Sequence, residues 1–340
     1  MARLVRVHPG EDAGIRRVRI GSGFRYVRAD GSPASPEDRE RIHSLVIPPA
    51  WTDVWISAEP DGQIQAVGTD DAGRRQYLYH PRWRERRDKG KFARALRLAE
   101  ALPGARRRVT TSLRTEGLTR ERVLAASFRL LDQGAPRIGS ARYLERHGSR
   151  GLTTLHRRDA SVQGSVVTLS FPAKSGQRAY IEVDDADLAA VVSELVVGRP
   201  RAPLLAYRKG KQRVGLTPEE VNAYIREIAG GRFTAKDFRT LRGTILAAEA
   251  LARMGTVDSE RQRKNAEALA VRATAGALGN TPAVARSSYI DPRVFAQYAR
   301  GRVLDLSKSP ESAIQDLLAR SASPDRQLKR ESRTRRAHRS

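Results

Sequence analysis

The sequence contains no cysteine, which excludes disulfide frameworks, zinc ribbons and thiol-based catalysis. Its six histidines show no metal-ligand spacing, and the His-Glu-x-x-His pattern of metalloproteases does not occur. No apolar run is long enough to span a bilayer, and the N-terminus has no hydrophobic signal core. We therefore expect a soluble cytoplasmic protein with no metal site and no membrane partner.

Nucleotide-binding motifs are also missing. The pattern Gly-x-x-x-x-Gly-Lys-[Ser/Thr] does not occur, so nothing supports ATP use. Gly21-Ser22-Gly23 lacks the third glycine of a dinucleotide fingerprint and is typical of a loop. Acidic residues are scattered, whereas two-metal nuclease chemistry needs clustered carboxylates. We therefore expect no cofactor.

Negative charge is scarce. The 340 residues include 63 Lys plus Arg against 38 Asp plus Glu, which leaves a net charge of +25. Such an excess indicates a polyanionic partner, and nucleic acid fits best because neutralising phosphates drives association. An anionic membrane surface fits less well, because no long basic amphipathic helix with a Trp or Phe face is evident.

The pattern of apolar residues predicts an α+β protein that begins with a β-rich domain, residues 1–90. Residues 15–28 alternate between basic and apolar or aromatic side chains, and we expect further strands at 54–57, 64–69 and 76–80 with a helix at 35–43. A dense basic run at 81–91 then predicts a connection between domains, with the boundary near residue 90.

A mainly helical second domain is expected over residues 91–320. Its helices are predicted at 92–102, 119–131, 217–228, 234–253, 259–278 and 310–320. One small β insertion interrupts them: strands at 165–171 and 178–183 pair through a turn that contains Lys174. The remaining residues, 321–340, form a basic tail that we expect to be disordered and to bind phosphate nonspecifically.

One tyrosine lies in a locally well-defined setting. The helix at 259–278 ends at Gly279, Thr281 can cap the next helix, and Pro282 suits its first position. That short helix must end near Asp291, because a proline follows. Tyr289 therefore lies near a helix end, where it is either an ordinary core tyrosine or a nucleophile.

Three cationic residues are candidates for chemistry: Arg137 just past a helix, Lys174 at a hairpin turn, and Arg239 in the second turn of a helix. Each alone is better interpreted as a surface or phosphate-contacting residue. Their separation in sequence gives no evidence that they converge in space.

Taken in order, these motifs resemble type IB DNA topoisomerases, most of all the small bacterial and poxvirus form. The motifs are Pro136-Arg137-Ile138-Gly139, the hairpin Lys174, Lys236-Asp237-Phe238-Arg239-Thr240, and Leu278-Gly279-Asn280-Thr281-Pro282 followed by Tyr289. Residues 68–80 are also similar to the first domain of that form. The resemblance covers most of the chain.

The resemblance implies a helical catalytic domain of the tyrosine recombinase and topoisomerase IB type, acting on double-stranded DNA as a nucleoid-associated monomer. It implies that supercoils are relaxed through a 3′-phosphotyrosyl intermediate, without ATP or metal. The implied catalytic residues are Arg137, Lys174, Arg239, Asn280 and Tyr289. The implied DNA contacts are Gln76, Tyr77, Tyr79 and Lys236.

The chain departs from the family pattern at Asn280, where many members carry histidine. Asparagine can still donate a hydrogen bond to a phosphate oxygen, but it cannot carry a charge. Two alternatives stay open: a tyrosine site-specific recombinase, against which the β-rich first domain argues, and a noncatalytic DNA-binding protein, for which charge alone would suffice.

Overall fold

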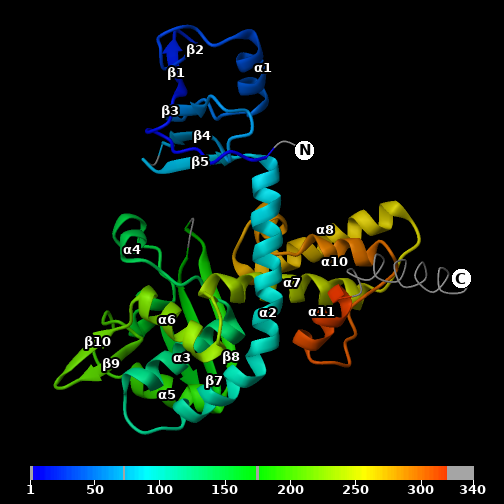
Figure 1. Cartoon of the computed structure of the whole chain (residues 1–340). Coiled ribbons are helices and arrows are strands. Elements are labelled where there is room, and N and C mark those ends of the chain that lie inside the picture. The colour runs from blue at the N-terminus through cyan, green and yellow to red at the C-terminus, as the bar shows by residue number, and fades with distance from the viewer. Residues whose placement is uncertain (1–2, 72, 174–175, 320–340) are drawn as a thin grey trace, which may run out of the picture. The chain divides into compact units, whose positions relative to one another are not determined.

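A computed structural model describes residues 3–71, 73–173 and 176–319 of the chain (Figure 1). Lys174 and the tail at 321–340 lie outside these residues, so the predictions made for them are not tested. The chain divides into two compact units, Met1–Gly90 and Lys91–Ser340. The first contains a β-sheet and the second is mainly helical, which confirms the α+β prediction.

The first unit is built on a five-stranded antiparallel sheet with the order β2-β1-β3-β4-β5. Helix α1 begins at Pro36, and the Ser35 side chain caps it by accepting a hydrogen bond from the Asp38 amide. Ile42 of this helix is buried in the small core of the unit. The elements are β1 (Gly14–Ile20), β2 (Gly23–Val27), α1 (Pro36–Ser44), β3 (Thr52–Ser57), β4 (Ile64–Thr69) and β5 (Arg75–Tyr79).

The basic run after β5, predicted as a connection between domains, is helical. Helix α2 (Pro81–Leu113) begins within the first unit and continues into the second. Its first three turns contain few apolar residues but many Arg, Lys and Glu residues, which favour a helix without producing an apolar periodicity. The predicted helix at 92–102 is therefore only the amphipathic middle of α2.

The second unit surrounds a three-stranded antiparallel sheet of order β6-β7-β8 with helices. Four helices carry or flank the candidate residues, namely α3 (Arg120–Gly134), α7 (Ala235–Met254), α8 (Glu260–Leu278) and α9 (Pro282–Ser288). The other elements are α4 (Ala141–His147), β6 (Ala160–Gln163), β7 (Val166–Pro172), β8 (Arg178–Asp184), α5 (Ala186–Leu195), β9 (Ala206–Lys209), β10 (Gln212–Gly215), α6 (Pro218–Ala229), α10 (Pro292–Tyr298) and α11 (Pro310–Ala319). Short 3₁₀ turns occur at Leu152–Thr154 and Arg157–Asp159.

The expected pairing of strands around Lys174 is confirmed, since β7 and β8 run antiparallel from Val166↔Asp184 to Pro172↔Arg178. The prediction of a single β insertion is wrong, however, because β9 and β10 form a separate hairpin that projects from the edge of the second unit (Figure 1). These strands have only four residues each and are rich in Lys and Arg, so they lack the apolar alternation that identifies a strand.

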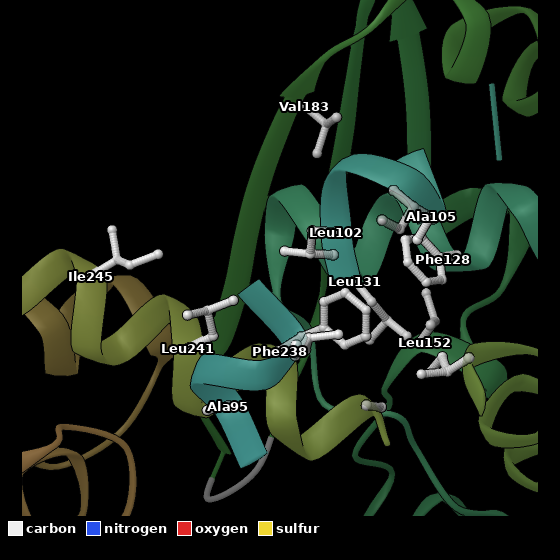
Figure 2. Packing of buried hydrophobic residues seen from close by; sticks show 14 of the residues in the cluster. Ala95, Leu102, Ala105, Phe128, Leu131, Leu152, Val183, Phe238, Leu241 and Ile245 are labelled. Carbon is white, nitrogen blue, oxygen red and sulfur yellow. The ribbon is translucent and has the colours of Figure 1, made fainter. Parts of the chain in front are cut away.

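The core of the second unit joins α2, α3 and α7 to the sheet. Phe128 of α3 is fully buried and makes edge-to-face contacts with Phe238 of α7 and Tyr224 of α6. Figure 2 shows Leu102 of α2, Val183 of β8 and Leu241 of α7 in the same apolar cluster. This packing holds the first turns of α7 against the end of α3, where two of the candidate arginines lie.

Candidate active site

Tyr289 lies where helix α9 ends. It is the C-cap residue, its amide donates to the Ala285 carbonyl at 3.0 Å, and its side chain is half-buried. Helix α7 contacts the backbone of Tyr289. The Thr244 hydroxyl donates to the Tyr289 carbonyl at 3.2 Å, and Gly243 comes so close that a Cβ atom there would lie 2.9 Å from the Tyr289 Cβ. The phenol is thus held at a helix end, as the sequence predicted.

Arg239 is the nearest cation to this phenol. Its guanidinium carbon lies 5.0 Å from the centre of the Tyr289 ring, and its side chain is buried, with 5% exposed. Two of its N–H groups donate to the carbonyls of Ala135, at 2.6 Å, and Leu278, at 2.8 Å, the last turns of two other helices. Its Nε is buried, with no hydrogen-bond partner among the described residues.

Arg137 extends from the loop after α3 toward the same place. Its guanidinium donates to the Gly279 carbonyl at 3.0 Å and to the Asn280 Oδ1 atom. The loop is held by Gly151, at which a Cβ would lie only 2.5 Å from both the Arg137 carbonyl oxygen and the Gly139 nitrogen. A side chain at this glycine would therefore displace Arg137.

The contact with Arg137 also orients the Asn280 amide. Because Oδ1 accepts from the arginine, the amide nitrogen Nδ2 is directed elsewhere, and it is buried without a partner in the described part of the chain. Among the described residues, the site therefore contains two buried N–H donors without an acceptor, Arg239 Nε and Asn280 Nδ2. Buried donors without a partner also occur elsewhere among the described residues, as at Trp55 and Arg157, but here two of them lie in one site, where a ligand could supply the acceptor.

The electrostatics of the site favour negative charge. Burial alone would raise the pKa of the Tyr289 hydroxyl, but the charge of Arg239 and its hydrogen bond, with the charges of Arg137 and Lys236, outweigh burial and lower that pKa below its ordinary value. Burial and the neighbouring charge of Arg239 lower the pKa of Arg137. Two like charges held this close would be relieved by a bound anion.

Lys174 lies outside the described residues, but the strands on either side of it reach this site. Ala173 and Gln177 line a cavity of 130 Å³ that is also lined by Arg137 and Arg239. The Ala173 amide donates to the Gln177 carbonyl at 2.7 Å, which closes the base of the turn. Four of the five candidate catalytic positions are thus brought together, and the turn that carries the fifth begins beside them.

The candidate DNA contacts divide between the two units. In the first, Tyr77 and Tyr79 lie on one face of β5 with their rings stacked 6.0 Å apart, as the period of two predicts. Gln76 lies on the opposite face and donates to Asp70 at 2.8 Å, so it does not join the tyrosines. Lys236 is exposed in the first turn of α7 and contributes to the lowered pKa of Tyr289.

Sequence reasoning missed two residues that shape this site. Gly243 was not singled out, because only the fold reveals that α9 ends against it. Asp237 was named only as part of the motif at 236–240, with no role of its own, although it is fully buried and paired with Arg94. An acidic residue two positions from a candidate catalytic arginine was the signal that could have identified it.

Among the described residues, no group of three or more His, Asp or Glu side chains has the geometry to hold a metal ion. Within the same residues, none of the helices combines the length and apolar character needed to cross a membrane.

Comparisons with known proteins identify the family of the chain. Residues 80–304 match the family model described as eukaryotic DNA topoisomerase I, catalytic core, and residues 23–70 match that of the bacterial DNA topoisomerase IB N-terminal domain. The chain is 30% identical over 285 residues to DNA topoisomerase 1B of Acanthamoeba polyphaga mimivirus, which covers 82% of this chain and 85% of that protein. The resemblance found in the sequence is confirmed: the chain belongs to the type IB DNA topoisomerases, isomerases that change the topology of DNA.

Proposed function

We propose that Tyr289 is the nucleophile of this topoisomerase and that Arg137, Arg239 and Asn280 bind the phosphate it attacks. The observation that carries this proposal is the pair of buried donors without an acceptor, Arg239 Nε and Asn280 Nδ2, beside a tyrosine whose pKa is lowered by cations. A tetrahedral phosphate group would supply the missing acceptors and the missing negative charge.

The reaction then has two reversible steps. The Tyr289 oxygen attacks a backbone phosphorus, loses its proton and forms an O–P bond, while the bond from phosphorus to the 5′-oxygen breaks. The departing 5′-oxygen takes up a proton and leaves as a free hydroxyl, and the 3′ end remains linked to the tyrosine. In the second step the 5′-hydroxyl attacks the phosphotyrosyl phosphorus and loses its proton, the bond from phosphorus to the Tyr289 oxygen breaks, and the tyrosine regains a proton as the strand is restored. The bond energy is conserved in the covalent link, so neither ATP nor a metal is required for the balance of atoms.

The two arginines stabilise the transition state. Negative charge builds up on the non-bridging phosphate oxygens during attack, and guanidinium groups already fixed in place oppose it without having to reorganise. Loss of one such donor typically lowers the rate by about 10²–10³-fold. The same cations favour the tyrosinate, so they assist both the nucleophile and the group that it attacks.

Lys174 is the general acid in this proposal, and protonates the departing 5′-oxygen. Support comes from the family resemblance and from Ala173 and Gln177, which flank the turn and line the cavity of the two arginines. Its substitution should slow cleavage mainly by making the leaving group poorer. A substrate with a 5′-sulfur leaving group, which needs no proton, should restore most of the rate to Lys174→Ala.

Asn280 acts as a neutral donor to a phosphate oxygen. Arg137 fixes its amide so that Nδ2, not Oδ1, is available, and this role needs no charge.

All the candidate residues come from one chain, so we propose that a monomer is sufficient for relaxation. Between the two steps, torsional strain rotates the free strand about the intact one.

The test is plasmid relaxation in EDTA without ATP, combined with detergent trapping of the covalent adduct. Wild-type protein should relax the plasmid and form an adduct under these conditions. Tyr289→Phe should bind DNA with nearly unchanged affinity but form no adduct. An adduct formed by Tyr289→Phe would exclude this tyrosine as the nucleophile, and a strict need for a metal would contradict the proposed chemistry.

A further inference from the structure

Asp237 is a fully buried carboxylate that the proposed chemistry does not use. It lies in the first turn of α7, between Lys236 and Arg239, in a part of the site otherwise dominated by cations. A buried charge is costly unless it is paired and hydrogen-bonded, so a residue kept there needs partners.

Both carboxylate oxygens of Asp237 are occupied. Oδ2 accepts from the Thr234 amide and hydroxyl, each at 2.9 Å, which completes the start of α7. Oδ1 accepts from the Arg94 Nε of α2 at 2.8 Å, and the Arg94 side chain is 34% exposed while that of Asp237 is fully buried. The carboxylate therefore fixes both the first turn of α7 and its attachment to α2.

Helix geometry separates Asp237 from the reacting groups. Residues three apart share a helix face, so Lys236 and Arg239 lie on one side of α7, whereas Asp237 is turned about 100° away from Lys236, toward α2. Asp237 is fully buried and faces α2, so it can act on the site only through the position of the helix and not through contact with DNA. Arg239 is sensitive to that position because its bonds to Ala135 and Leu278 fix the far end of its side chain.

We propose that Arg94 and Asp237 are a positioning pair for strand cleavage. They fix the rotation of α7 about its axis and its position along that axis, so that Arg239 is directed at the phosphate beside Tyr289. This inference rests on the proposed roles of Arg239 and Tyr289. Because α2 is continuous from the first unit into the second, the pair also joins the helix that links the two units to the helix that carries the arginine.

The test uses single-turnover cleavage at saturating DNA by Arg94→Gln, which removes the cation but leaves Asp237 in place. We expect cleavage to slow by about tenfold, since a displacement near 1 Å in a reacting group can cost about 10²-fold. In an Arg239→Ala background the same substitution should change the rate by less than about twofold, because the group that it positions is gone.

A control is Arg114→Gln. Arg114 pairs with Asp187 in the first turn of α5, and neither residue lies in a helix that carries or flanks a candidate residue. Arg114→Gln should leave the cleavage rate unchanged. Arg94→Lys keeps a cation beside Asp237 and provides a second test if Arg94→Gln does not fold; it should slow cleavage less, with the same dependence on Arg239.

Equal slowing by Arg94→Gln with and without Arg239, or equal slowing by Arg114→Gln, would overturn the inference and leave the pair a purely structural one. Neither result would affect the proposed function, which fails separately if Tyr289→Phe forms an adduct.

Discussion

Gly243 allows a direct test of how closely α7 supports the tyrosine. A Cβ atom at this position would lie 2.8 Å from the Tyr289 carbonyl oxygen, 2.9 Å from its Cβ and 3.1 Å from a methyl group of Leu278. Ordinary contacts begin near 3.4 Å, so in Gly243→Ala the backbone of Tyr289 must move by about half an ångström. The φ angle at Gly243 is helical, so alanine introduces no backbone strain of its own.

Two opposing effects set the stability of this variant. Alanine in a helix interior gains about 1 kcal/mol over glycine, whereas overpacking typically costs about 1–3 kcal/mol. The net change should thus be a loss of about 0–2 kcal/mol. The cleavage rate should also fall, because a shift of half an ångström at the nucleophile corresponds to a rate loss on the order of tenfold, or about 1.4 kcal/mol in the barrier.

Gly104→Ala is the matched control. Gly104 is also in a helix interior, but the nearest atom to its new Cβ would be the flexible Arg107 guanidinium at 3.9 Å. This variant should gain about 0.5–1 kcal/mol and cleave at the wild-type rate. Denaturant unfolding and single-turnover adduct formation give both quantities. The reasoning is refuted if Gly243→Ala is stabilised as much as Gly104→Ala and cleaves equally fast.

Two further predictions concern pH. The positive charge of Lys236 helps to lower the pKa of Tyr289, so Lys236→Gln should move the rise of the single-turnover cleavage rate to higher pH; an unmoved profile would contradict this electrostatic role. Burial raises the pKa of Tyr224 to about 12, so the unfolded chain ionises first, and stability present below pH 10 should fall by about 2 kcal/mol as the pH rises to 12. In Tyr224→Phe that loss should disappear from urea unfolding measured between pH 9 and 12; an unchanged loss would assign it to other groups.

Local chemistry explains which helices could be predicted from the sequence. Helix α6 begins with Thr217 and Glu220, whose side chains each bond to the backbone of the other, and α8 ends at Gly279 in the left-handed conformation. Such signals depend on a few neighbouring residues. The start of α2 is harder to predict. Pro81 suits the first helical position and the His80 side chain accepts a hydrogen bond from the Arg82 amide, but no apolar stripe follows, and the charged side chains suit both a helix and a linker.

The convergence of the candidate residues could not be predicted from spacing. Arg137 and Asn280 are 143 positions apart and yet hydrogen-bonded, and Arg239 bonds to carbonyls 104 and 39 positions away. These contacts depend on how α3, α7 and α8 pack, which periodicity does not specify. In the sequence alone, only the resemblance to a family indicates that these residues belong to one site.

The two tyrosines of the second unit show what distinguishes a candidate nucleophile from a core residue. Tyr224 is buried among apolar side chains, and burial raises its pKa to about 12. Tyr289 is also desolvated, yet its pKa is lowered, because α7 and the loop after α3 bring Arg239 and Arg137 to its hydroxyl. A sequence shows that a tyrosine lies near a helix end, but not which charges surround it. The local pattern is therefore compatible both with a core residue and with a nucleophile, and the proposed role of Tyr289 is supported by the arginines that tertiary packing gathers beside it.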